Sequence, residues 1–104
     1  NSEETTLTST SATQIASLAA ASFRSAKVYI QAVDSTSSEY HVTELLLVHN
    51  GTTVTYTEYG MLYTGSAALA TFTADINAGN VRILAAGAST NSTTYKVVKT
   101  MIEV

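Results

Sequence analysis

The chain contains no cysteine among its 104 residues. This absence excludes a disulfide framework, a thiolate nucleophile and the zinc sites that are built on cysteine. No G-x-G-x-x-G stretch, P-loop or G-x-S-x-G motif occurs in the sequence either. The signatures of dinucleotide binding, of phosphate cradling and of a serine nucleophile elbow are therefore missing.

Charge is scarce as well. Charged residues make up 12% of the chain, which is about half of the usual share. The five basic residues are spread along the chain and the net charge is -3, so no basic stripe favours binding of nucleic acid. No apolar run approaches the roughly 18 to 20 residues of a membrane-spanning helix, and no signal peptide is visible. We expect no nucleic-acid partner and no membrane partner. Since the chain begins at Asn1 without Met, we expect a processed product or an excerpt.

In several segments of the chain, apolar residues recur at every second position. In FRSAKVYIQAVD the apolar residues Ala26, Val28, Ile30 and Ala32 alternate with polar ones, which is typical of a half-buried strand. Similar patterns, with no proline and no convincing helix, predict an all-β fold: an antiparallel β-sandwich or small barrel of about seven strands. The predicted strands cover residues 22–33, 40–49, 52–63, 69–76, 81–86 and 94–104. Residues 14–23 fit either a helical face or a short strand.

Residues 1–13 (NSEETTLTSTSAT) are polar, rich in Thr and Ser, and aperiodic. We interpret them as an extended N-terminal arm that lies along a neighbour, because Leu7 is the only large apolar residue in the segment. Residues 14–104 then form a single β-sandwich domain.

The hairpin of residues 69–84 has the best-determined register. If Asn77 to Asn80 form the turn, Ile76, Ala74 and Phe72 pair with apolar residues of the next strand. The same register sets Asp75 opposite Arg82 on the other face.

The hairpin of residues 41–60 (HVTELLLVHNGTTVTYTEYG) raises a different question. Asn50-Gly51 predicts a two-residue turn, but residues 45–48 are apolar at four successive positions, so both faces of that strand are apolar. In the two-residue register one face carries Leu46 and Val48 together with the stripe Tyr59, Met61 and Tyr63.

This face could be a subunit interface, part of the core, or a ligand surface on which tyrosines stack against sugars. A chain of this size has one core and cannot cover both faces. We therefore predict a self-associating protein whose interface comprises Leu46, Val48, Tyr59, Met61 and Tyr63. The expected oligomer is a homotrimer, by analogy with the family whose resemblance is given below.

No residue set predicts catalysis, a cofactor or a metal ion. His41 and His49 are eight residues apart on one strand, roughly 26 Å, so one metal cannot bind both. Glu44 and Glu58 point to opposite faces in the predicted register and cannot form the carboxylate pair of a glycosidase. We expect a protein that is not an enzyme.

Four stretches, SFRSAKVYIQ, the hairpin of residues 41–60, LATFTADINAGNVRIL and TTYKVVKTMIEV, follow one another over residues 22–104. In this order they resemble a module of virion structural proteins from marine tailed phages, including phages of cyanobacteria. The resemblance favours a short strand within residues 14–23.

The resemblance implies a non-enzymatic component of the virion, either a capsid decoration (cement) protein or a fibre module. It would contact other virion proteins of the capsid or tail through the N-terminal arm. The alternative is a small carbohydrate-binding adhesin of the lectin type.

Overall fold

The computed structural model describes residues 2–103. It contains eight strands and a single turn of 3-10 helix, and no other helix occurs in this range. The elements are β1 Ser2–Leu7, β2 Thr13–Ala19, η1 Ala20–Ser22, β3 Phe23–Asp34, β4 Glu39–His49, β5 Val54–Tyr63, β6 Ala70–Asn77, β7 Asn80–Gly87 and β8 Thr93–Glu103. Between residues 2 and 103, no helix has the length and apolar character needed to cross a membrane.

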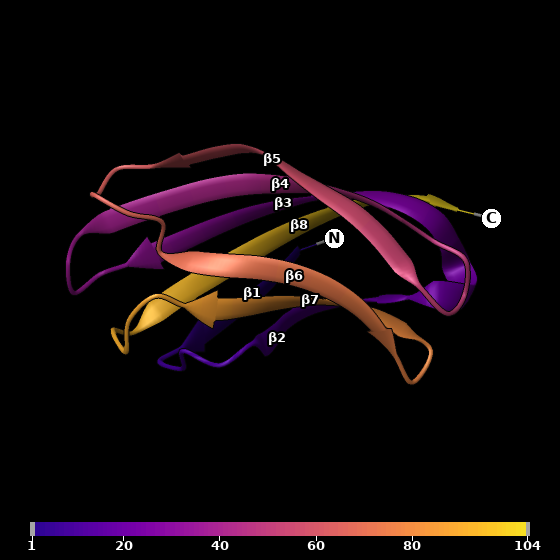
Figure 1. The fold of residues 1–104 in the computed structure, drawn as a ribbon, viewed down its shortest axis with the longest axis horizontal. Coiled ribbons are helices and arrows are strands. Elements are labelled where there is room, and N and C mark those ends of the chain that lie inside the picture. Colours follow the sequence, from indigo (N-terminus) through magenta and orange to yellow (C-terminus); the bar gives the residue numbers. More distant parts are fainter. Residues whose placement is uncertain (1, 104) are drawn as a thin grey trace.

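The strands form two antiparallel sheets that lie face to face (Figure 1). One sheet has five strands in the order β1-β8-β3-β4-β5, and the other has three in the order β2-β7-β6. The predicted all-β antiparallel sandwich is confirmed, in its open rather than its barrel form. Every predicted strand is present within two residues of its expected ends, apart from position 104, which lies outside the described residues. Residues 14–19 lie in β2, residues 20–22 form the short helix and Phe23 begins β3, so the strand interpretation is the correct one.

The core lies between the sheets. In β3 the predicted row of Ala26, Val28, Ile30 and Ala32 is buried, while Lys27 and Tyr29 between them are exposed. This alternation follows from the pleat, which points successive side chains to opposite faces. The inner row of β3 meets apolar side chains of β2, β6 and β7, among them Leu18, Phe72, Val81 and Ile83.

The β6–β7 hairpin has the predicted register. Ile76 pairs with Val81 and Asp75 pairs with Arg82. Ala78 and Gly79 at the turn have φ of +52° and +81°, the left-handed values that a tight hairpin turn requires. The Arg82 guanidinium donates two hydrogen bonds to the Asp75 carboxylate, from Nε to Oδ1 (2.8 Å) and from Nη2 to Oδ2 (2.6 Å). These bonds hold the pKa of Asp75 below its usual value.

Strand β1 occupies the edge of the large sheet. Residues 2–7, within the segment that we interpret as an arm, are extended and pair with β8 of the same chain. Most of their side chains are exposed or half-buried. The division of the chain into an arm and a domain after residue 13 stays a prediction. Residues 2–7, about half of the segment that we interpret as an arm, pair with β8.

Glu3 of β1 forms hydrogen bonds with β8 in its own sheet and with β2 in the other sheet. Lys99 Nζ of β8 donates to Glu3 Oε2 (2.6 Å) and to the carbonyl oxygen of Ser17 in β2 (3.1 Å). The backbone N–H of Ser17 also donates to Glu3 Oε2 (3.0 Å). Burial alone would raise the pKa of Glu3, but the hydrogen bonds from Lys99 and Ser17 and the charge of Lys99 together lower it.

We expect Glu3→Gln to lower the free energy of unfolding by about 1–2 kcal/mol at pH 7, because Lys99 loses its anion and its side chain is only 10% exposed. A carboxyl with a lowered folded-state pKa stabilises above its unfolded pKa and stops doing so as the pH falls through the folded value. The difference between wild type and variant should therefore narrow below about pH 4.3. Urea unfolding at several pH values measures it, and a difference that does not change with pH would contradict the ion-pair explanation.

Candidate functional site

One face of the five-stranded sheet is uncovered. In β4, Leu45 and Leu47 are buried at 0% and 2% exposure, whereas Leu46 and Val48 are 50% and 49% exposed. The three-stranded sheet lies against one side of the five-stranded sheet (Figure 1), and Leu45 and Leu47 are part of the core between the two sheets. The second apolar face predicted for this strand thus exists, and nothing within residues 2–103 covers it. We call it the outer face.

The outer face combines residues from β3, β4, β5 and β8. Tyr59, Glu44, Tyr29 and Val98 form one row across these four strands, since each is paired with the next. A second row runs from Val48 through Ser25 to Ile102. The exposed large apolar residues of the outer face are Tyr29, Tyr40, Leu46, Val48, Tyr59, Leu62, Val98 and Ile102.

The loop between β4 and β5 has four residues, Asn50 to Thr53, rather than the predicted two. His49 pairs with Val54, and Leu46 pairs with Thr57. The two-residue turn is therefore wrong, because the Asn50 side chain caps a wider loop with hydrogen bonds to the backbone of Thr52 and Thr53. A shift by two residues keeps the side chains of residues 54–59 on their predicted faces.

A bulge then divides the predicted stripe. Gly60 has φ of +69°, and the register shifts between Val42 and Glu44, so that Val42 pairs with Leu62. Tyr63 pairs with His41 on the inner side, where their rings meet edge to face at 5.9 Å.

The predicted interface residues consequently separate into two groups. Leu46, Val48 and Tyr59 share the outer face, whereas Tyr63 lies on the other side of the sheet and Met61 stands in the bulge; all five are exposed. Leu62 lies on the outer face, where the sequence pattern predicted Met61 and Tyr63 instead. Tyr29 and Val98 also lie on the outer face. The period-two pattern of their strands indicates that both side chains point away from the core.

The polar residues of the outer face partner one another. Lys27 Nζ lies 3.8 Å from Glu44 Oε1, and the Tyr59 hydroxyl donates to the same oxygen at 3.4 Å. Glu44 therefore has partners from β3 and β5. Two shallow hollows flank Leu46 on this face. One of about 340 Å³ extends to Thr55 and Thr57, and one of about 370 Å³ extends to Thr100 and Ile102.

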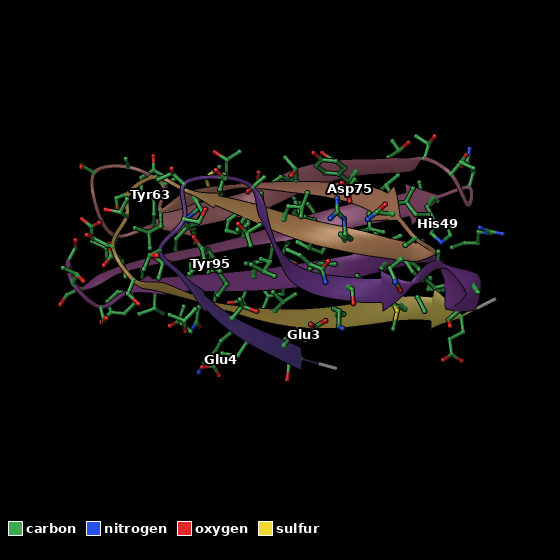
Figure 2. All side chains as sticks on the ribbon, turned by 90° about the horizontal axis from the view of Figure 1, so that it is seen from below. Glu3, Glu4, His49, Tyr63, Asp75 and Tyr95 are labelled. Carbon is green, nitrogen blue, oxygen red and sulfur yellow. The ribbon has the colours of Figure 1, made fainter. Side chains whose placement is uncertain are left out.

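The two histidines are buried on the inner side of β4 but far from each other. His41 contacts Tyr63, which lies at the opposite end of the molecule from His49 (Figure 2). His41 Nδ1 accepts a hydrogen bond from the N–H of Leu69 (3.1 Å), and Nε2 has no partner in the described part of the chain. Burial lowers the pKa of His41, and the nearby charge of Glu58 opposes this shift only in part.

Glu44 and Glu58 point to opposite faces, as predicted. Glu44 lies on the outer face, while Glu58 pairs with Leu45 on the inner side and accepts a hydrogen bond from Thr43 Oγ1 (2.7 Å). Within residues 2–103, no group of three or more His, Cys, Asp or Glu side chains is placed to hold a metal ion.

A polar cluster that the sequence patterns did not reveal closes one end of the sandwich. Asp34, at the end of β3, accepts hydrogen bonds from the backbone N–H groups of Thr36 and Ser37 and from Asn91 Nδ2 (2.9 Å). The hydrogen bond from Asn91 is the main cause that lowers the pKa of Asp34. Since these bonds join two loops 57 residues apart in the sequence, we interpret the cluster as a structural clasp.

The fold is similar to parts of two phage tailspike proteins. The tailspike protein of Acinetobacter phage vB_ApiP_P1 matches 96% of this chain with a TM-score of 0.70 at 22% identity. The tailspike protein gp49 of Acinetobacter baumannii bacteriophage Fri1, a capsular polysaccharide depolymerase, matches 97% with a TM-score of 0.51 at 14% identity. The chain covers 21% and 19% of these proteins, about a fifth of their length. No family model and no curated protein matches the chain.

These similarities show the fold. The fold is one that phage tailspike proteins contain, which agrees with the predicted virion location. The neighbours come from Acinetobacter phages, and a marine or cyanobacterial origin stays a prediction.

The expectation that the protein is not an enzyme is wrong. It rested on the missing catalytic constellation and on the resemblance to virion proteins. The same fold forms part of a tailspike that is a capsular polysaccharide depolymerase. A module that shows no catalytic residues of its own can therefore belong to an enzyme.

We expect Gly60→Ala to destabilise the protein by about 1 kcal/mol, since a residue with a Cβ rarely adopts positive φ. A Cβ at this position meets no atom within 4 Å, so backbone strain is the whole effect. Gly60→Asn is the matched control, because asparagine tolerates the left-handed region better. Chemical denaturation measures both variants, and an equal loss for Ala and Asn would contradict a strained bulge.

Proposed function

We propose that this chain is a module of a phage tailspike or tail fibre that associates with copies of itself through the outer face. The observation that carries the proposal is the exposed apolar surface over β3, β4, β5 and β8 in a fold that two tailspikes contain. Of the two particle locations that the sequence suggested, these neighbours favour the tail over the capsid.

Burial of the outer face would favour association. Each large apolar side chain contributes roughly 1.5–3 kcal/mol when it is fully removed from water, and part of the sum offsets the cost of association. Leu62 and Ile102 are 69% and 71% exposed, so most of this free energy is still available in the isolated chain. Soluble monomers rarely expose contiguous apolar patches larger than a few hundred Å².

A second copy suits the charges of this face. Lys27 and Glu44 lie side by side on the face, and Glu4 of β1 is opposite Lys96 of β8 in the strand register at its edge. A face that carries both signs can be complementary to another copy of itself, whereas a strongly charged partner would repel half of these groups. The trimer and the contact of the N-terminal segment with other virion proteins belong to this proposal by analogy with phage tail proteins.

Light scattering at micromolar concentration tests the interface. We expect wild type to be oligomeric and the double variant Leu46→Asp/Tyr59→Asp to be a folded monomer, because the two carboxylates would be buried without partners. Met61→Asp is the matched control: Met61 is 46% exposed but stands in the bulge, so the variant should associate like wild type.

A monomeric wild type, or equal loss of association in the double variant and in Met61→Asp, would contradict the outer face as the interface. Circular dichroism of each variant separates lost association from lost folding. Antibodies against the module, used on intact particles in electron microscopy, should label the tail; label on the head would support a capsid decoration protein instead.

Carbohydrate binding is the second candidate. Tyr29, Tyr40 and Tyr59 are 40–50% exposed on the outer face, and aromatic faces stack on sugar rings. The similar Fri1 tailspike is a capsular polysaccharide depolymerase, so capsular oligosaccharides are the ligands to test. A monomeric wild type whose tyrosine fluorescence changes on titration with such oligosaccharides would favour this second function.

A further inference from the structure

In the loop of residues 50–53, the side-chain oxygen of Asn50 accepts three hydrogen bonds. Asn50 Oδ1 accepts from the backbone N–H of Thr52 (3.0 Å), from Thr52 Oγ1 (3.0 Å) and from the backbone N–H of Thr53 (2.9 Å). Three donors on one amide oxygen polarise the carbonyl and would stabilise negative charge on that oxygen. Enzymes use such a set of donors to stabilise the oxyanion of a tetrahedral intermediate.

The next residue supplies a nucleophile with a base beside it. The backbone N–H of Gly51 donates to His49 Nδ1 at 3.0 Å. His49 is 3% exposed, and its Nε2 lies 2.7 Å from the carbonyl oxygen of Phe23. That carbonyl can only accept, so the ring proton sits on Nε2 and the lone pair of Nδ1 faces Gly51. The guanidinium of Arg24 lies 3.4 Å from the same nitrogen.

We propose that Asn50-Gly51 is a self-modification site at which the folded protein promotes deamidation of its own asparagine. The nitrogen of Gly51 transfers its proton to His49 Nδ1 and forms a bond to Asn50 Cγ, and the three donors stabilise the resulting oxyanion. The bond from Cγ to Nδ2 then breaks, and Nδ2 leaves as ammonia with the proton from His49. Water opens the five-membered imide at either carbonyl to give aspartate or isoaspartate.

Glycine at position 51 makes this step sterically open. Gly51 has φ of +97° and carries no side chain of its own that would hinder attack by its nitrogen. The loop is exposed to water. Asn91-Ser92 is a second asparagine followed by a small residue, and it differs in the group that must leave. Its Nδ2 donates to Asp34 Oδ2 (2.9 Å) and to Ser37 Oγ (3.2 Å), which holds the amide nitrogen in place.

The product would change the end of the β4–β5 hairpin. Each event adds one negative charge at position 50, next to Gly51, whose N–H shares His49 Nδ1 with Arg24. Isoaspartate also lengthens the backbone at a loop that borders a hollow of about 170 Å³ beside Val48. The modification would therefore alter charge and shape at one end of the outer face over time, without any other protein.

The test compares the folded and the unfolded chain. The native protein and the same protein in denaturant are incubated in one buffer, and the peptide that contains Asn50 is followed by mass spectrometry and by enzymatic methylation of isoaspartate. We expect Asn50 to react about tenfold faster in the native protein, since a positioned base and oxyanion donors act only there. Asn91 should react more slowly in the native protein than in denaturant.

Two variants separate the loop geometry from the reactivity of an ordinary Asn-Gly pair. Thr52→Val removes one of the three donors and should slow the native reaction about threefold or more, since the lost donor is exposed to solvent. Thr55→Val is the matched control on the next strand. His49→Gln can keep the bond to Phe23 but provides no base, and it should bring the native rate to that of the denatured chain. A native rate at or below the denatured rate, or equal rates for Thr52→Val and Thr55→Val, would overturn the proposal.

Discussion

The packing of five strands against three determines what the rest of this molecule can do. The inner rows of β3, β4 and β8 contribute buried residues such as Val28, Leu45 and Val97, and they meet the inner rows of β2, β6 and β7 in one core. A chain of 104 residues has too few residues for a third layer. The opposite side of the larger sheet is therefore left to solvent or to a partner, and its apolar residues are those that the core did not use.

Three of the four sheet edges are protected by irregular geometry or short length, rather than by charge, which is scarce in this sequence, or by proline, which is absent. The edge strand β5 carries the bulge at Gly60, and the edge strand β2 carries a register shift between Gln14 and Ala16. The edge strand β1 is only six residues long. The fourth edge strand, β6, has eight residues and pairs with β7 without a register shift. Bulges and short edge strands hinder further strand pairing. This arrangement favours contact through the outer face over open-ended addition of strands at the edges.

Local patterns predicted much of this fold, and contacts distant in the sequence account for the rest. The β6–β7 hairpin was predictable in full because apolar spacing, turn residues and the charges of Asp75 and Arg82 all demand one register. The β4–β5 loop was not, because Asn-Gly suits a two-residue turn while the hydrogen bond that the backbone N–H of Thr53 donates to Asn50 Oδ1 favours a wider one. The place of β1 depends on Glu3 and Lys99, which are 96 positions apart, and no periodicity reveals such a pair. The bulge at Gly60 also produces no recognisable pattern in the sequence, so the stripe of Tyr59, Met61 and Tyr63 looked continuous.

Stability and recognition use opposite faces of the same strands in this protein. The fold requires only that alternate positions be apolar and fill the space between the sheets, and many sequences meet that requirement. The similarity to the tailspike of phage vB_ApiP_P1, with a TM-score of 0.70 at 22% identity, is what such a permissive requirement produces. Side chains of the outer face are not needed for the core, so they can change with the partner of each protein. The identity of the partner must therefore be determined from Leu46, Tyr59, Val98 and their neighbours in this chain, and cannot be transferred from a protein that shares only the fold.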